Sequence, residues 1–422
     1  RSCLVGSEMC IRDSIDFSHL CGQTISMPII SKKGANLPTS PIRKLAKQAN
    51  MAKARGIEVF HLNIGQPDLA SPKSALEAIR NFSDNVVAYG PSEGTVSFRN
   101  KLVSYYQEHD IEIDAEDILV TTGASEAIIM ALDCITSEDD ELIIPEPFYA
   151  NYETFAAACG VKVVGIPSSF ESQFSLPNIE TIEAAITSKT RALFICNPNN
   201  PSGYVYSKEE LECLGQLAKK YDIFFIVDEV YREFVYDGHK HISVMQLENL
   251  SAHAILIDSM SKRYSMCGAR IGCLITKNKE VTHAALKFAQ SRLCPPTIAL
   301  HACEAALDES QQYLDHAIEE YEKRRTIAIA HLSNIEGVSV SLPKGAFYCL
   351  VKLPVTDSDH FAKWMLETFQ DKGETLMVAP ANGFFSGDLA GKNMIRIAFV
   401  LNSKKLIRAI TLLKLGLDAY QK

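Results

Sequence analysis

Residues 223–231 read Ile-Phe-Phe-Ile-Val-Asp-Glu-Val-Tyr, in which an unbroken apolar run of five residues is followed by two acidic residues. Apolar runs without polar alternation are typical of strands covered on both faces, as in a mostly parallel sheet. In open parallel sheets the ligand site lies beyond the carboxyl ends of the strands. The run therefore predicts a buried strand that delivers Asp228 to such a site.

Six further runs of this kind alternate with amphipathic stretches along the chain. They are residues 117–122, 141–144, 161–166, 191–196, 254–258 and 273–276. Ser207 and Glu210 have the spacing of a capping box, which predicts a helix over residues 208–221. The alternation predicts an α/β fold, with a three-layer α/β/α domain, a mostly parallel sheet and right-handed crossovers.

The pattern changes after about residue 299, which indicates a second domain. A long charged helix is predicted over residues 311–335, followed by a strand that contains residues 345–348 and a final helix from Lys404. We therefore expect a large domain over residues 64–300 and a smaller α+β domain formed by residues 27–63 and 301–422. Residues 1–26 resemble translated vector sequence, so we expect a non-native or disordered extension and a native start at Met27.

Composition excludes several classes of protein. The 422 residues carry 51 acidic and 42 basic side chains, a formal net charge of -9, which argues against a nucleic-acid partner. The chain has no uncharged apolar run of about 18 residues, so no membrane-spanning helix is expected. The 12 cysteines are scattered without metal-ligand spacing, which is typical of reduced thiols in a cytoplasmic protein.

The first segment that carries chemistry is Ser259-Met260-Ser261-Lys262, directly after a predicted strand. A lysine that leaves a buried strand end is desolvated, which lowers its pKa and frees the amine as a nucleophile. The two serines, together with Arg270, are donors suited to a phosphate. Taken alone, such a segment is more often a solvated turn.

Three other segments follow predicted strands. Asp228 can hold a pyridine nitrogen protonated, and Tyr231 can hydrogen-bond a ring hydroxyl, although a lone aspartate there is as often a helix N-cap. Residues 197–203, Asn-Pro-Asn-Asn-Pro-Ser-Gly, predict a rigid loop. Residues 122–125, Thr-Gly-Ala-Ser, allow the amides of a helix N-terminus to approach an anion.

In order and spacing, these segments together resemble the class I and II, fold-type I aminotransferases related to aspartate aminotransferase. The resemblance covers about residues 42–419. It implies the fold of pyridoxal-phosphate-dependent transferases and pyridoxal 5'-phosphate as cofactor. It also implies transfer of an amino group from an amino acid to a 2-oxo acid such as 2-oxoglutarate, by a homodimer with shared active sites.

The resemblance assigns a role to each matching residue. Lys262 would bind the cofactor covalently and move the proton, Asp228 would pair with the ring nitrogen, and Tyr231 would hold the ring oxygen with Asn200. The other implied cofactor contacts are Ala124, Ser125, Tyr149, Ser259, Arg270 and, across the dimer, Tyr89. The implied substrate contacts are Gly65, Asn200 and Arg396. Of these, Arg396 would bind the α-carboxylate as a bidentate pair.

Several points stay open at the level of sequence. Some relatives bind a second substrate carboxylate with a lysine where this chain has Ser125, and others with an arginine of the partner subunit. Arg292 is either that arginine or a structural surface residue. An aspartate-like donor is favoured, while alanine, aromatic and methionine donors remain possible. A β-elimination lyase that releases pyruvate is the alternative enzyme, and a cofactor-sensing regulatory domain is a remote one.

Overall fold

The computed structural model describes residues 28–38, 40–387 and 390–420. The prediction for residues 1–26 lies outside the described residues. The contacts divide the chain into a short unit, Arg1–Leu37, and a second unit, Pro38–Lys422. In the short unit a five-residue helix, α1 (Lys32–Asn36), begins after Ser31, whose hydroxyl accepts a 3.0 Å hydrogen bond from the amide of Gly34.

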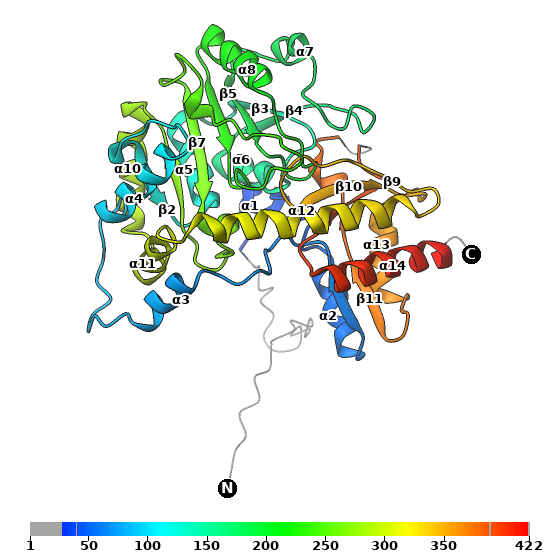
Figure 1. The fold of residues 1–422 in the computed structure, drawn as a ribbon. Helices are drawn as coiled ribbons and strands as arrows, with labels where there is room; N and C mark the ends of the chain where they lie inside the picture. Colours follow the sequence, from blue (N-terminus) through cyan, green and yellow to red (C-terminus); the bar gives the residue numbers. More distant parts are fainter. Residues whose placement is uncertain (1–27, 39, 388–389, 421–422) are drawn as a thin grey trace, which may run out of the picture. The chain divides into compact units, whose positions relative to one another are not determined.

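A seven-stranded sheet forms the centre of the second unit (Figure 1). Its strands, in sheet order, are β2 (Ile118–Thr121), β8 (Gly272–Ile275), β7 (Ala254–Ser259), β6 (Phe224–Asp228), β5 (Thr190–Cys196), β3 (Glu141–Pro145) and β4 (Lys162–Ile166). The two pairs that include β8 are antiparallel, and the other four pairs of this sheet are parallel. The predicted mostly parallel sheet is therefore confirmed.

Helices cover both faces of this sheet. They are α3 (Lys73–Arg80), α4 (Val96–Gln107), α5 (Ala124–Ile135), α6 (Asn151–Cys159), α7 (Ile179–Ala184), α8 (Lys208–Tyr221), α9 (Met260–Arg263), α10 (Lys279–Arg292) and α11 (Thr297–Ala306). Alternate residues of one strand enter opposite cores. In β6, Ile226 packs into the core that contains α5, α6 and α10, whereas Val227 packs into the core that contains α4, α8 and α11. Because both faces are covered, the strands read as continuous apolar runs, and the three predicted layers are confirmed.

Two smaller sheets come from the ends of the chain. A parallel pair joins β1 (Glu58–His61) to β11 (Glu374–Met377), and an antiparallel sheet has the order β12 (Ala379–Pro380), β13 (Met394–Ala398), β10 (Tyr348–Lys352) and β9 (Ser339–Val340). The helices beside them are α2 (Ala46–Ala54), α12 (Gln311–Ser333), α13 (Ser358–Glu367) and α14 (Ser403–Tyr420). Short 3-10 turns occur at Ala115–Asp117, Val244–Gln246 and Asn382–Phe384. The division into domains at residues 64–300 stays a prediction.

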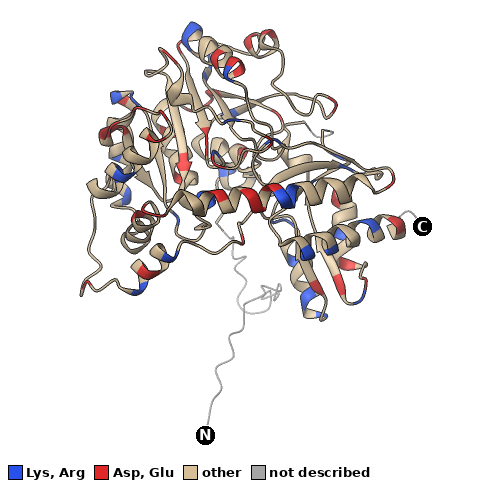
Figure 2. Cartoon of the chain, in the orientation of Figure 1, with Lys and Arg blue, Asp and Glu red and all other residues tan. Residues whose placement is uncertain are grey.

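Most local predictions agree with the observed elements. The capping box of Ser207 and Glu210 opens α8 at Lys208 as expected. The predicted long charged helix is α12, along which acidic and basic side chains are interspersed (Figure 2). The strand expected from Gly345 begins only at Tyr348. The amides of Gly345 and Ala346 instead donate to the carbonyls of Gly203 and Phe234, so this backbone serves the neighbouring loop.

Candidate active site

One cavity of about 590 Å³ lies at the carboxyl ends of β5, β6 and β7. Cys196, Asp228 and Ser259, the last residues of these strands, line it. So does Ala124, the first residue of α5. Every site residue predicted from the sequence lines this cavity except Tyr89 and Arg292. The cavity thus lies where a parallel sheet presents its strand ends to a ligand.

The Lys262 amine is held inside the cavity by neutral groups. α9 begins directly after β7, and the hydroxyl of Ser259 accepts the amide of Ser261 at 3.1 Å to cap it. The half-buried Nζ of Lys262 donates to the carbonyl of Gly65 at 2.9 Å and lies 3.7 Å from Sγ of Cys267. Among the described residues no carboxylate lies within ion-pair distance of this amine.

Asp228 is buried at the end of β6. The hydroxyl of Tyr152 donates to Oδ2 at 2.7 Å, and the amide of Val230 donates to Oδ1 at 3.2 Å. Burial raises the pKa of Asp228 to about 6, and these hydrogen bonds only partly oppose the rise. A cation beside this carboxyl would lower its pKa again, and a protonated ring nitrogen is such a cation.

An anion-binding corner lies at the start of α5. Gly123 has a φ of 77°, and a Cβ there would lie 2.3 Å from a terminal nitrogen of Arg270. The Arg270 guanidinium therefore packs directly over the glycine, and it donates to the carbonyl of Cys267 at 3.0 Å. Ser125 and Ser259 line the same cavity. An arginine, two hydroxyls and a helix N-terminus are the donors that a phosphate needs.

Arg396 of β13 is 1% exposed and oriented by two asparagines. One terminal nitrogen donates to Oδ1 of Asn200 at 2.9 Å, and the other donates to the carbonyl of Asn63. Its buried Nε has no hydrogen-bond partner within the described residues. Since an unpaired buried donor is costly, this guanidinium is suited to an anionic ligand in the cavity.

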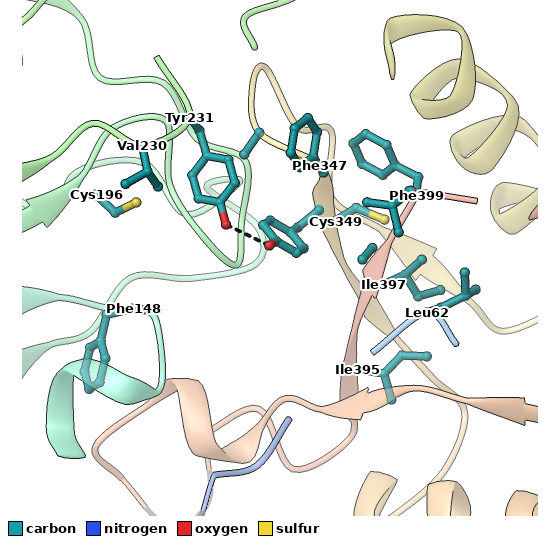
Figure 3. Packing of buried hydrophobic residues seen from close by; sticks show 14 of the residues in the cluster. Leu62, Phe148, Cys196, Val230, Tyr231, Phe347, Cys349, Ile395, Ile397 and Phe399 are labelled. Carbon is teal, nitrogen blue, oxygen red and sulfur yellow. Dashed lines mark hydrogen bonds between the residues drawn. The ribbon is translucent and has the colours of Figure 1, made fainter. Parts of the chain in front are cut away.

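Aromatic hydroxyls complete the lining. The hydroxyls of Tyr231 and Tyr348 share a 2.7 Å hydrogen bond, drawn as a dashed line from Tyr231 in Figure 3. Tyr149 accepts a 2.9 Å hydrogen bond from Asn151, and burial raises the pKa of Tyr149 to about 12. Burial also holds the pKa of Tyr231 well above its usual value. Both phenols therefore stay protonated near neutral pH and act as donors.

The family model for class I and II aminotransferases matches residues 57–413 of this chain. The chain belongs to this family. It is thus an enzyme of amino-group transfer.

Several named aminotransferases are similar to this chain over most of its length. Aspartate aminotransferase of Bacillus subtilis is 30% identical over 91% of this chain and 98% of its own length. Aromatic-amino-acid aminotransferase 2 of Thermococcus litoralis is 31% identical over 88% of this chain and 94% of its own length. The solved structure of aspartate aminotransferase from Thermus thermophilus with maleate has a TM-score of 0.84 at 27% identity, and the match covers 92% of this chain and 100% of that one. The lyase and the regulatory domain are not favoured.

Two predicted residues of the aminotransferase lie outside the cavity. Tyr89 is 78% exposed. Arg292, at the end of α10, donates to the carbonyls of Ser92 at 3.3 Å and Val120 at 3.0 Å and forms an ion pair with Glu126. The expectations that Tyr89 reaches the phosphate of a neighbouring subunit and that Arg292 reads a distal carboxylate stay predictions.

The structure adds residues that the sequence analysis missed. Tyr152 bonds to Asp228, Tyr348 bonds to Tyr231, and Cys267 lies beside Lys262. Tyr152 follows Tyr149 by three residues, and this helical spacing could have suggested that both face the cavity. Arg43 also lines the cavity, and no local pattern distinguishes it from the neighbouring Lys44.

The composition led to two further expectations, one about membrane-spanning helices and one about the cysteines. No helix in the described part of the chain is long and apolar enough to cross a membrane. None of the nine cysteines in described residues forms a disulfide, and Cys196, Cys273, Cys303 and Cys349 are buried.

Proposed function

We propose that this aminotransferase binds pyridoxal 5'-phosphate in the cavity and moves the α-amino group of an L-amino acid to a 2-oxo acid such as 2-oxoglutarate. An aspartate-like donor is favoured, in line with two of the named relatives. The observation that carries the proposal is the meeting of Lys262, Asp228 and Arg396 in one cavity. These residues supply an amine, a buried carboxyl and a buried guanidinium.

The residues present fit this cofactor at both ends. The phosphate fits the corner of Arg270, Ser125 and Ser259, where an added Cβ at Gly123 would strike the arginine. A ring nitrogen fits Asp228, whose raised pKa reflects a buried carboxyl without a cation bonded to it. The ring would lie against Tyr149, and its oxygen would accept hydrogen bonds from Tyr231 and Asn200.

When bound, pyridoxal phosphate supplies an electrophilic carbonyl and a ring that takes up electrons. Arg396 binds the α-carboxylate of the amino acid, oriented by Asn63 and Asn200. Lys262 would hold the cofactor until the amino acid binds, and its free amine would then carry the proton between the substrate Cα and the cofactor carbon C4′. Asp228 stays ionised beside the ring nitrogen and keeps that nitrogen protonated. The same residues act in reverse order on the 2-oxo acid, which gives two half-reactions.

A homodimer with shared active sites is part of the proposal. Tyr89 lies in a segment with Val86 and Val87, whose side chains are also exposed. Exposed apolar side chains gathered in one segment are typical of an interface. Tyr89 would then contact the phosphate bound in the neighbouring subunit. The cytoplasmic location that the sequence predicts stays a prediction.

The experiment is to load the protein with pyridoxal phosphate and record its absorbance while single amino acids are added. The proposal requires that at least one donor converts the cofactor band to that of the aminated form and that 2-oxoglutarate restores the original band. A band that no amino acid shifts contradicts the proposal. So does release of pyruvate and ammonia without an acceptor, which is the result expected of a lyase.

A further inference from the structure

We infer that Arg43 reads the distal carboxylate of a dicarboxylic substrate, and so sets the preference of this enzyme for aspartate-like donors. This inference rests on the proposed function. Its basis is the charge inventory of the cavity together with the way the turn that carries Arg43 is held.

The cavity has one more cation than the proposed reaction uses. Its charged lining residues among those described are Arg43, Asp228, Lys262, Arg270 and Arg396. The phosphate corner uses Arg270, the reacting carbon uses Lys262, and the α-carboxylate uses Arg396, while Asp228 serves the ring nitrogen. Arg43 is left with no assigned partner. A second carboxylate on the substrate would balance its charge.

Arg43 itself is unpaired. No hydrogen bond or ion pair of its guanidinium occurs among the described residues, and its side chain is exposed at the cavity. Arg43, Tyr149 and Arg396 line the same cavity. We therefore expect that a substrate held by Arg396 beside Tyr149 can extend its side chain toward Arg43.

The turn before α2 fixes this position from three sides. The carbonyl of Ile42 accepts a 2.9 Å hydrogen bond from Asn63, the same asparagine that orients Arg396. Lys44 forms an ion pair with Asp359 of α13. Leu45 is buried in the core. The backbone on both sides of Arg43 is thus tied down while its side chain stays available, which lowers the ordering cost of binding an anion.

The alternative residue, Arg292, is partly engaged by protein groups and lies outside the cavity lining. Its guanidinium donates to the carbonyls of Ser92 and Val120 and pairs with Glu126. Both of these hydrogen bonds use one terminal nitrogen, and Nε and the other terminal nitrogen have no hydrogen-bond partner among the described residues. Arg292 nevertheless does not line the cavity, whereas Arg43 does. Arg43 would lose no protein hydrogen bond or ion pair when it binds a carboxylate. It is therefore the favoured residue for the distal carboxylate.

The test compares Arg43→Gln with Lys47→Gln, which removes the same charge from an exposed position of α2 outside the cavity lining. The first readout is the dissociation constant of maleate, an unreactive dicarboxylate, for the cofactor-loaded enzyme, with propionate as the monocarboxylate. Arg43→Gln is expected to raise the dissociation constant of maleate about 10- to 100-fold, the range for loss of a charge-assisted hydrogen-bonded pair. The dissociation constant of propionate should stay nearly unchanged. Lys47→Gln is expected to leave the affinities for maleate and propionate unchanged.

The second readout is the first half-reaction alone, with L-aspartate or L-alanine and no 2-oxo acid, because 2-oxoglutarate is itself a dicarboxylate. The aspartate-to-alanine ratio of kcat/KM should fall in Arg43→Gln by the same factor as the affinity for maleate. Circular dichroism and the melting temperature establish that the variant is folded.

Three outcomes overturn the inference. They are unchanged maleate binding in Arg43→Gln, an equal loss of maleate and propionate, and a loss of maleate binding that appears in Arg292→Gln instead. Failure of the proposed function is distinguishable, because it requires a wild-type enzyme whose cofactor band no amino acid shifts. The maleate titration would still report on Arg43.

Discussion

The hydroxyl of Tyr152 donates a 2.7 Å hydrogen bond to Oδ2 of Asp228, and both side chains are buried. This bond favours the ionised carboxylate, because the phenol can only donate to it at neutral pH. Burial opposes it and is the larger effect, so the pKa of Asp228 still rises to about 6. The pKa of Asp228, and with it the protonation state of the carboxyl, thus depends on the hydrogen-bond donors and cations around it.

Tyr152→Phe is expected to bind pyridoxal phosphate about 10-fold more weakly, since it removes one hydrogen bond to a charged group. The dissociation constant is measured by absorbance titration of the cofactor-free protein. Tyr204→Phe is the matched control, because that hydroxyl bonds to Glu210 away from the cavity. Equal effects of the two substitutions would contradict a role for Tyr152 at the ring nitrogen.

The cofactor-free protein is expected to lose stability as the pH rises through about 6. The folded pKa of Asp228 lies above its unfolded value, so the folded state binds more protons between pH 4 and 6. The free energy of unfolding should fall by up to about 3 kcal/mol across this window and then level off. Denaturant titrations at several pH values measure it, with Asp228→Asn as the reference that lacks this titration. Loading with pyridoxal phosphate should remove the difference, since a ring cation lowers the pKa of Asp228.

Lys262→Ala is expected to abolish turnover while still binding the cofactor without a covalent bond. Loss of a general base slows such a step about 10²- to 10⁴-fold, and loss of the attachment point adds to this. Gel filtration in denaturant followed by mass spectrometry of borohydride-treated protein detects the covalent attachment. Lys208→Ala, on the exposed face of α8, is the control. Near-normal transamination by Lys262→Ala would contradict the proposed role of Lys262 in cofactor attachment and proton transfer.

Gly123→Ala is expected to damage both folding and phosphate binding. The residue has a φ of 77°, and its Cβ would lie 2.3 Å from the Arg270 guanidinium. The matched control is Gly238→Ala, where φ is 72° and nothing lies within 4 Å of the added Cβ. Both should lose about 1–2 kcal/mol from the backbone strain, and Gly123→Ala should lose more. Melting temperatures with and without inorganic phosphate separate the two contributions, because only the Gly123 variant should respond less to phosphate.

Arg396→Gln is expected to raise KM for every amino acid donor about 100-fold, because it removes a buried partner of the α-carboxylate. Propionate should bind more weakly by a similar factor. The ratio between aspartate and alanine should change little, in contrast to the result expected for Arg43→Gln. A loss confined to dicarboxylic donors would instead assign Arg396 to the distal carboxylate.

Sequence patterns were sufficient for the parts of this enzyme that depend on local structure. Continuous apolar runs predict strands buried on both faces, and the polar residues that follow them must lie at the carboxyl edge of a parallel sheet. Lys262, Asp228, Asn200 and Ser125 are each placed by this rule, which requires no knowledge of strand order. The capping box at Ser207 works in the same way, because its donors and acceptors are neighbours in the chain.

Contacts between distant segments were decided only by the tertiary structure. The bond of Arg396 to Asn200 joins β13 to a loop 196 residues earlier, and Tyr348 meets Tyr231 across 117 residues. Two further features also depend on contacts between distant segments. They are the antiparallel direction of β8 and the position of Arg43 in the cavity lining. The residues that end buried strands can be identified from sequence, because the apolar pattern that marks such a strand is formed by residues adjacent in the chain. The sequence did not determine which surfaces meet, because that follows from the packing of whole layers.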